Sequence, residues 1–177
     1  MINEIIKKNG LSFGLITGLA SIVFTTALYV IDLKLFVSGW VAFASLAIRL
    51  VIGIVLLSKT KKELNGIFSY KEAFTTYFIS AVIGVFISVF FNIILFNYVD
   101  PAAKDTIRDL SAKFLIETLS KFNTPASAIN EAVSKLKETD QFSPLELLKG
   151  SIFSVLGYAI LGLILAAFFK GSASSRE

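Results

Sequence analysis

Residues 74–98 read FTTYFISAVIGVFISVFFNIILFNY and carry no charged side chain. A helix of about 20 apolar residues is long enough to cross a hydrocarbon core of about 30 Å. Residues 11–31, 35–58 and 150–169 are similarly apolar, and the only charge within these three segments is Arg49. Any one of these segments alone is compatible with a buried helix of a soluble protein. Four of them in one short chain predict an integral membrane protein.

The composition agrees with this prediction. Hydrophobic residues make up 55% of the 177 residues and charged residues 17%, against about 45–50% and about 25% in soluble domains. The sequence contains no cysteine and no histidine. This excludes disulfides, thiolate and imidazole catalysis, and the usual zinc and iron ligand sets. We therefore expect no metal and no cofactor.

The distribution of basic residues predicts the orientation of the chain. Segment 99–149, between the third and last spans, holds seven basic and eight acidic residues. The opposite ends of the spans carry an excess of basic residues, namely Lys7, Lys8, Lys59, Lys61, Lys62, Lys71, Lys170 and Arg176. Short loops rich in lysine and arginine stay in the cytoplasm. Both termini are therefore predicted to be cytoplasmic, and the loop 99–149 extracytoplasmic.

Residues 100–143 are charged, with apolar residues at helical spacing. Asp100-Pro101 predicts a helix start that is followed by Ile107, Leu110, Phe114, Leu115, Leu119 and Phe122. Thr124-Pro125 repeats the signal before Ile129, Ala132, Val133 and Leu136, and Ser143-Pro144 precedes the last span. The segment is thus predicted to form two amphipathic helices, whose apolar stripes are buried against each other, the outer leaflet or a partner protein.

The predicted fold is all-α. A four-helix transmembrane bundle, formed as a single domain by residues 1–177, carries an external amphipathic helical hairpin between its third and fourth helices. Ser69 and Glu72 are spaced as a capping box, in which each side chain accepts a hydrogen bond from a free backbone N–H group. The third helix is therefore expected to begin near Tyr70.

Arg49 lies near the middle of the predicted span 35–58. A charge at this depth costs between about 2.5 and more than 10 kcal/mol, so it marks a candidate functional site. Polar residues expected at the same depth are Thr17, Ser21, Ser88, Asn92 and Tyr158. One hypothesis is that Arg49, Asn92 and Tyr158 bind an anionic ligand, such as a lipid head group or a small anion. The alternative is structural: Arg49 donates hydrogen bonds to hydroxyls and carbonyls or extends toward one membrane surface.

Gly10, Gly14 and Gly18 share one face of the first predicted helix. Small residues at this spacing allow two membrane helices to approach closely. The pattern predicts helix packing, either inside the chain's own bundle or between two copies in a homodimer.

The segments 66–74, GIFSYKEAF, and 98–101, YVDP, flank the third span. Both resemble an uncharacterised family of small bacterial membrane proteins, domain of unknown function 4199, found mainly in Bacteroidetes-type bacteria. The order of the elements is also similar. The resemblance implies a four-helix protein of the bacterial inner membrane and transfers no catalytic residue.

No aspartate or glutamate lies inside a predicted span, and the basic cluster at residues 59–71 is too short to indicate nucleic-acid binding. The leading hypothesis is a non-enzymatic accessory or scaffold protein whose partners are membrane lipids and a protein or second copy bound through residues 100–143. The alternative is a small transporter or ligand-binding membrane protein that uses Arg49.

Overall fold

The structure is a computed structural model that describes residues 2–171; Arg176 lies outside them. Within this range the chain forms six α-helices, one short 3₁₀ helix and one π-helical turn, which confirms the all-α prediction. In chain order the elements are α1 (Glu4–Ile31), η1 (Leu33–Val37), α2 (Gly39–Glu63), α3 (Tyr70–Ile94), η2 (Leu95–Val99), α4 (Pro101–Lys121), α5 (Ala126–Glu138) and α6 (Pro144–Phe169).

Four helical segments are long and apolar enough to cross a membrane: α1, α2, α6, and α3 continued by η2. Large apolar side chains cover the outside of these helices, among them Val23, Phe43, Phe90 and Phe153. Contiguous apolar surface of this kind marks contact with lipid or with another apolar surface. The chain is therefore an integral membrane protein with four candidate spans.

The first two helices begin at other residues than the apolar segments that predict them. Asn3 accepts a hydrogen bond from Ile5 N–H at 2.9 Å, so α1 begins at Glu4 rather than at residue 11. Residues 33–37 form η1, so α2 begins at Gly39 rather than at residue 35. A polar first turn costs little where a cap satisfies the backbone donors and the turn lies outside the hydrocarbon.

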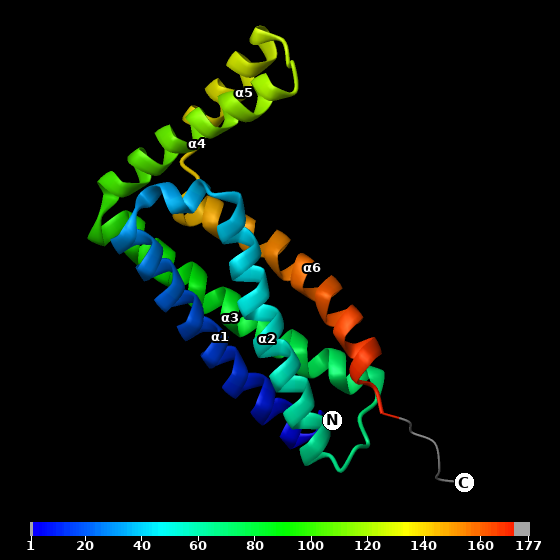
Figure 1. The fold of residues 1–177 in the computed structure, drawn as a ribbon. Helices are drawn as coiled ribbons and strands as arrows, with labels where there is room; N and C mark the ends of the chain where they lie inside the picture. Colours follow the sequence, from blue (N-terminus) through cyan, green and yellow to red (C-terminus); the bar gives the residue numbers. More distant parts are fainter. Residues whose placement is uncertain (1, 172–177) are drawn as a thin grey trace.

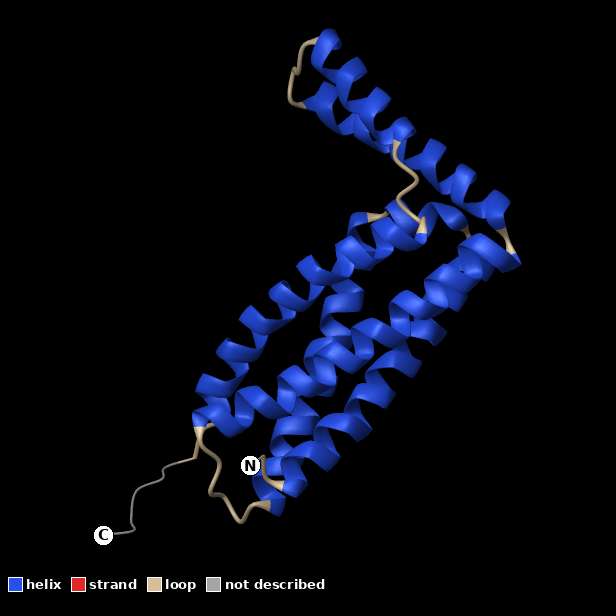
Figure 2. Ribbon diagram, turned by 180° about the vertical axis from the view of Figure 1, so that it is seen from behind, coloured by secondary structure: helices blue, strands red, loops and turns tan. Residues whose placement is uncertain are grey.

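α3 lies at the centre of the bundle. It packs against α1 on one side and α6 on the other, while α2 makes smaller contacts with all three helices. Figures 1 and 2 show α2 lying across the groove between α1 and α6. Because α1 and α3 are joined through the antiparallel α2, they run parallel. The close pair in the bundle is thus α1 with α3, which are not consecutive in the sequence.

The end of the bundle that carries the N-terminus is held by a buried cluster and by polar contacts. Asn9 is buried and donates hydrogen bonds from Nδ2 to Thr60 Oγ1 at 3.2 Å and to Glu63 Oε2 at 2.7 Å. Gly171 N–H donates to Phe68 O at 2.8 Å, which ties the end of α6 to the α2–α3 loop. The buried cluster comprises Leu57, Phe68, Ala73, Tyr77, Ala81, Leu165 and Ala166.

The opposite end of the bundle carries the helical hairpin α4–α5. In Figures 1 and 2, α4 does not continue the bundle axis but runs across the end of the bundle and projects beyond it. Leu95, Phe96, Ala103 and Ile107 form the buried cluster at this junction. The predicted hairpin between the third and fourth spans is therefore present.

Three of the four predicted helix caps are made. Ser69 and Glu72 form the capping box at α3, Asp100 Oδ1 accepts from Ala103 N–H at 3.1 Å, and Ser143 caps α6. The prediction for Thr124 is wrong. Pro125 occupies the capping position of α5, with no side-chain hydrogen bond. Its fixed φ sets the first turn of the helix without a polar cap.

Candidate intramembrane arginine site

Arg49 connects α2 to two neighbouring helices. Its Nη2 donates a hydrogen bond to Ser21 Oγ on α1 at 3.0 Å. Its Cζ lies 4.8 Å from the centroid of the Tyr158 ring on α6, which is the geometry of a cation–π contact. The structure therefore brings together Arg49 and two of the residues that sequence depth places near it.

Two glycines allow α3 to hold these helices together. A Cβ atom on Gly53 of α2 would lie 2.6 Å from Tyr77 Cε2, and one on Gly162 of α6 would lie 2.6 Å from Tyr77 Cδ1. The Tyr77 ring of α3 thus fits between the two glycines and is 4% exposed. Gly53 is one turn from Arg49 and Gly162 one turn from Tyr158, so this packing fixes the spacing of the site.

A small cavity adjoins the guanidinium. It has a volume of about 50 Å³ and is walled by α1 and α2, with Ser88 of α3 the single residue that belongs to neither helix. Its polar lining comprises Thr17, Ser21, Thr25, Ser45, Ser88 and Arg49, and its apolar lining comprises Ala20, Phe24, Ile48 and Ile52. A second cavity of about 10 Å³ touches Arg49, Tyr77, Ser80 and Tyr158. The site is therefore polar and rich in hydroxyl groups.

The charge of Arg49 is not matched by a nearby carboxylate. None of the ion pairs found among residues 2–171 includes Arg49. The cation is half-buried and contacts one hydroxyl and one aromatic ring. These neutral groups can orient a guanidinium and can solvate a bound anion, and they provide no acid–base pair.

The structure does not bring Asn92 to this site. Its Nδ2 donates to the backbone oxygen of Ser88, one turn earlier on α3, at 2.7 Å. The side-chain amide is thus engaged by its own helix, as is common for asparagine in apolar surroundings. Depth along the helix could not predict which way its hydrogen bonds are directed.

Gly10, Gly14 and Gly18 form a ladder of contacts with α3. A Cβ atom on any of them would lie within 2.6–2.9 Å of Ile79, Ile83 or Ile87, respectively. All three glycines are buried. The face predicted to pack closely therefore does so inside the chain, and a homodimer using this face would require α3 to move away.

Sequence reasoning missed Ser45, Thr25 and Tyr77. Ser45 precedes Arg49 by one helical turn, and Thr25 follows Ser21 by one turn, so both occupy the same helix faces as the residues that were identified. The four-residue spacing from Arg49 and Ser21 was a usable signal. Tyr77 gave no such signal, because its role depends on two distant glycines.

Comparison with known proteins places the chain in a family. No curated protein and no solved structure matches it. The model of a protein family described as "Protein of unknown function (DUF4199)" matches residues 12–171. The match includes the hairpin, three of the candidate spans and the first span from residue 12 onward. The chain belongs to the DUF4199 family of proteins of unknown function.

Proposed function

We propose that the protein is a non-enzymatic accessory protein of the bacterial cytoplasmic membrane and that its α4–α5 hairpin rests on the outer leaflet. The single observation that carries this proposal is a short apolar stripe on α4, which includes Ala103, Ile107 and Phe114. The stripe begins in contact with the bundle and continues past the edge of the bundle.

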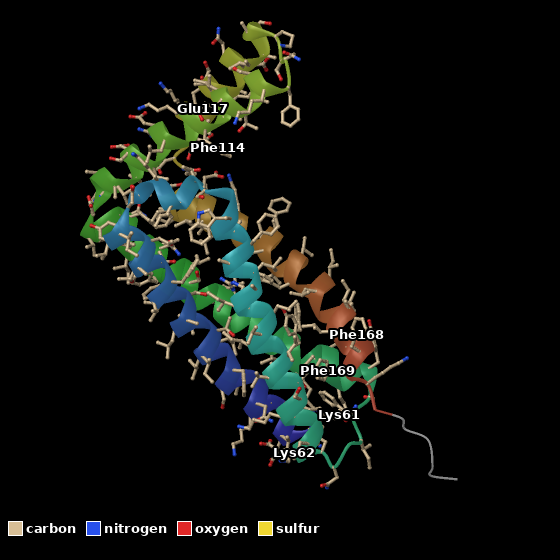
Figure 3. The ribbon with its side chains drawn as sticks, in the orientation of Figure 1. Lys61, Lys62, Phe114, Glu117, Phe168 and Phe169 are labelled. Atoms are coloured by element: carbon tan, nitrogen blue, oxygen red, sulfur yellow. The ribbon has the colours of Figure 1, made fainter. Side chains whose placement is uncertain are left out.

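Ala103 and Ile107 form the buried part of this stripe, with 3% and 2% of their surfaces exposed at the bundle end. Phe114 follows Ile107 by two helical turns, so it lies on the same face of α4. In Figure 3, Phe114 lies on the side of the hairpin nearer the bundle. It is 49% exposed. A side chain on this face beyond the bundle edge would meet the lipid interface around the bundle.

Polar contacts hold the hairpin in this position. Lys104 Nζ on α4 lies 2.6 Å from Asp140 Oδ2, just after α5. Asn97 Nδ2 donates to Phe142 O at 2.8 Å, and Tyr29 OH of α1 donates to Asp100 Oδ2 at 2.8 Å. The hairpin is thus fixed to α1, η2 and the start of α6. These contacts favour a hairpin that keeps one position relative to the bundle over a hairpin that moves freely.

The charge on the hairpin favours contact through apolar area. Segment 99–149 is close to neutral, with seven basic and eight acidic residues. Several of these charges pair within the segment, as in Arg108 with Asp105 and Lys135 with Glu131. Binding to the leaflet would therefore depend weakly on anionic lipid and on salt, unlike the binding of polybasic segments.

Sidedness follows from the lysine-rich ends. Lys61 and Lys62 lie at the end of the bundle opposite the hairpin, as Figure 3 shows. The positive-inside rule places that end in the cytoplasm and the hairpin outside.

A single-cysteine experiment tests the leaflet contact, and the cysteine-free chain makes it direct. Spin labels at Phe114→Cys and, as a matched control, at Ser134→Cys on the exposed side of α5 are compared in lipid nanodiscs. We expect the label at position 114 to be accessible to oxygen and shielded from a water-soluble relaxation agent, and the label at 134 to show the reverse. Equal water access at both positions contradicts leaflet contact. Shielding at 114 that appears only when a cellular protein crosslinks there would identify a protein partner instead.

A further inference from the structure

We propose that the cavity beside Arg49 is a binding site for one anionic group, either a halide ion or a charged oxygen of a carboxylate or phosphate. This inference is independent of the role of the hairpin, because the site lies in the bundle and shares no residue with α4 or α5.

Arg49 places a guanidinium, which is a cationic group, within the span 39–63. A charge in the middle of a bilayer is costly, and pairing with an opposite charge reduces that cost. The described ion pairs supply no carboxylate partner. A bound anion would neutralise the guanidinium where the chain itself does not.

The wall of the cavity carries several hydrogen-bond donors. Ser21 Oγ accepts from Arg49, which leaves its own hydrogen free to donate to an anion. Ser45, Thr25 and Ser88 bring further hydroxyl groups to the same cavity. Thr17 is excluded as a donor, because it already donates to Phe13 O at 2.8 Å. One guanidinium and several hydroxyls form a donor set suited to an anion and unsuited to a metal cation.

The volume of the cavity limits the size of the group that it can hold. A cavity of about 50 Å³ has room for a few water molecules, since each needs about 10–15 Å³ by this measure. This is enough for a halide, or for one carboxylate or phosphate oxygen with a water, but too small for a complete lipid head group.

Access follows from the same lining. The cavity is partly open, and Ile48 on α2, which lines it, is 38% exposed, so a group could approach it from the outer surface of the bundle. The anion therefore has two possible sources. It is either a free halide or the charged oxygen of an anionic lipid that enters from the side.

Chloride titration of the purified full-length protein tests the site. The ³⁵Cl NMR line width is followed in a non-ionic detergent for the wild type, Arg49→Gln, Ser21→Ala and the control Arg108→Gln, whose arginine lies on the hairpin. A parallel arm measures by native mass spectrometry how much phosphatidylglycerol, relative to phosphatidylcholine, each variant retains. Circular dichroism and gel filtration check that each variant is folded.

We expect saturable binding of chloride, of phosphatidylglycerol or of both to the wild type, retained in Arg108→Gln and lost in Arg49→Gln. Ser21→Ala, which keeps the charge, should bind about tenfold more weakly, as expected for the loss of one charge-assisted hydrogen bond. If only phosphatidylglycerol binds, the source is lipid; if only chloride binds, it is the solution. The proposal is wrong if neither anion binds the wild type, if Arg108→Gln abolishes binding equally, or if Ser21→Ala binds as tightly as the wild type. The last criterion applies even if Arg49→Gln fails to fold.

Discussion

Gly14 on α1 and Ile83 on α3 are so close that a Cβ atom added to Gly14 would lie 2.7 Å from the Ile83 Cβ. Two β-carbons essentially never approach to this distance. Replacing Gly14 with alanine must therefore move the two helices apart or force Ile83 into a strained rotamer.

We expect Gly14→Ala to destabilise the protein by about 1–3 kcal/mol, the usual range for overpacking a tightly packed site. Thermal unfolding in detergent, followed by circular dichroism, measures the effect. Gly157→Ala on α6 is the matched control, because a Cβ there meets no atom within 4 Å. The control should be neutral or slightly stabilising, since alanine favours a helix over glycine by roughly 0.5–1 kcal/mol. Equal stability of the two variants would show that α1 and α3 are not in contact as described.

The ion pair between Lys104 and Asp140 makes the position of the hairpin dependent on pH. Burial raises the pKa of the Asp140 carboxyl. Hydrogen bonds from Lys104 and from Phe142 N–H and the nearby charges of Lys104 and Arg108 lower this pKa by more than burial raises it, so the net pKa lies below its ordinary value of 3.8. A carboxyl whose pKa is lowered on folding stabilises the fold above its unfolded pKa. This contribution is complete above about pH 5 and is lost as the pH falls through the lowered pKa.

Distances between spin labels at Lys34→Cys on η1 and Ser127→Cys on α5 should therefore stay narrow near neutral pH and broaden below pH about 4. Asp140→Asn should broaden the distribution at neutral pH as well. Asp105→Asn is the control, because it breaks an ion pair whose carboxylate is exposed and which lies within α4. A narrow distribution for Asp140→Asn would mean that other contacts alone hold the hairpin.

Asp100 joins two stabilising interactions in one side chain. Its Oδ1 accepts from Ala103 N–H at the start of α4, and its Oδ2 accepts from Tyr29 OH at 2.8 Å. Tyr29→Phe removes one hydrogen bond and should cost about 0.5–1.5 kcal/mol. Asp100→Ala also removes the cap, which alone is worth about 0.5–2 kcal/mol, so it should cost more.

A double-mutant cycle on unfolding free energy checks this arrangement. Once Asp100 is alanine, Tyr29→Phe should have almost no further effect, because the two side chains act on each other. Fully additive losses would indicate that Tyr29 and Asp100 do not interact.

Sidedness can be tested with the same cysteine-free background. Cysteines introduced at Ser134 on α5 and at Lys62 near the end of α2 lie at opposite ends of the protein. A membrane-impermeant maleimide added to intact spheroplasts should label position 134 at once and position 62 only after permeabilisation. The reverse pattern would invert the proposed orientation.

The sequence was sufficient for features that depend on local chemistry. Ser69 and Glu72 predict the start of α3 because a capping box needs only residues three apart. Asp100-Pro101 predicts the start of α4 for a similar reason. The absence of charge over residues 74–98 predicts a span, because the length and apolar character of one segment can be judged without knowing which helices surround it.

Features that depend on distant pairs could not be predicted in this way. The place of Tyr77 between Gly53 and Gly162 requires knowing that α3 lies between α2 and α6. The contacts of Asn9 with Thr60 and Glu63 join residues that are more than fifty positions apart. At the Arg49 site, composition and depth predicted which residues lie at the same level. They could not show that Ser21 and Tyr158 contact Arg49 while Asn92 does not.

The glycine ladder between α1 and α3 has an ambiguity built into it. The three contacts, Gly10 with Ile79, Gly14 with Ile83 and Gly18 with Ile87, repeat every four residues with the same separation in sequence. A slip of one helix along the other by about 6 Å would place Gly14 on Ile79 and Gly18 on Ile83 with nearly equal fit. The ladder therefore fixes how closely the helices approach but not their register. Tyr29 of α1 must meet Asp100, which follows α3 and η2, and this polar pair selects one alignment among the shifted ones.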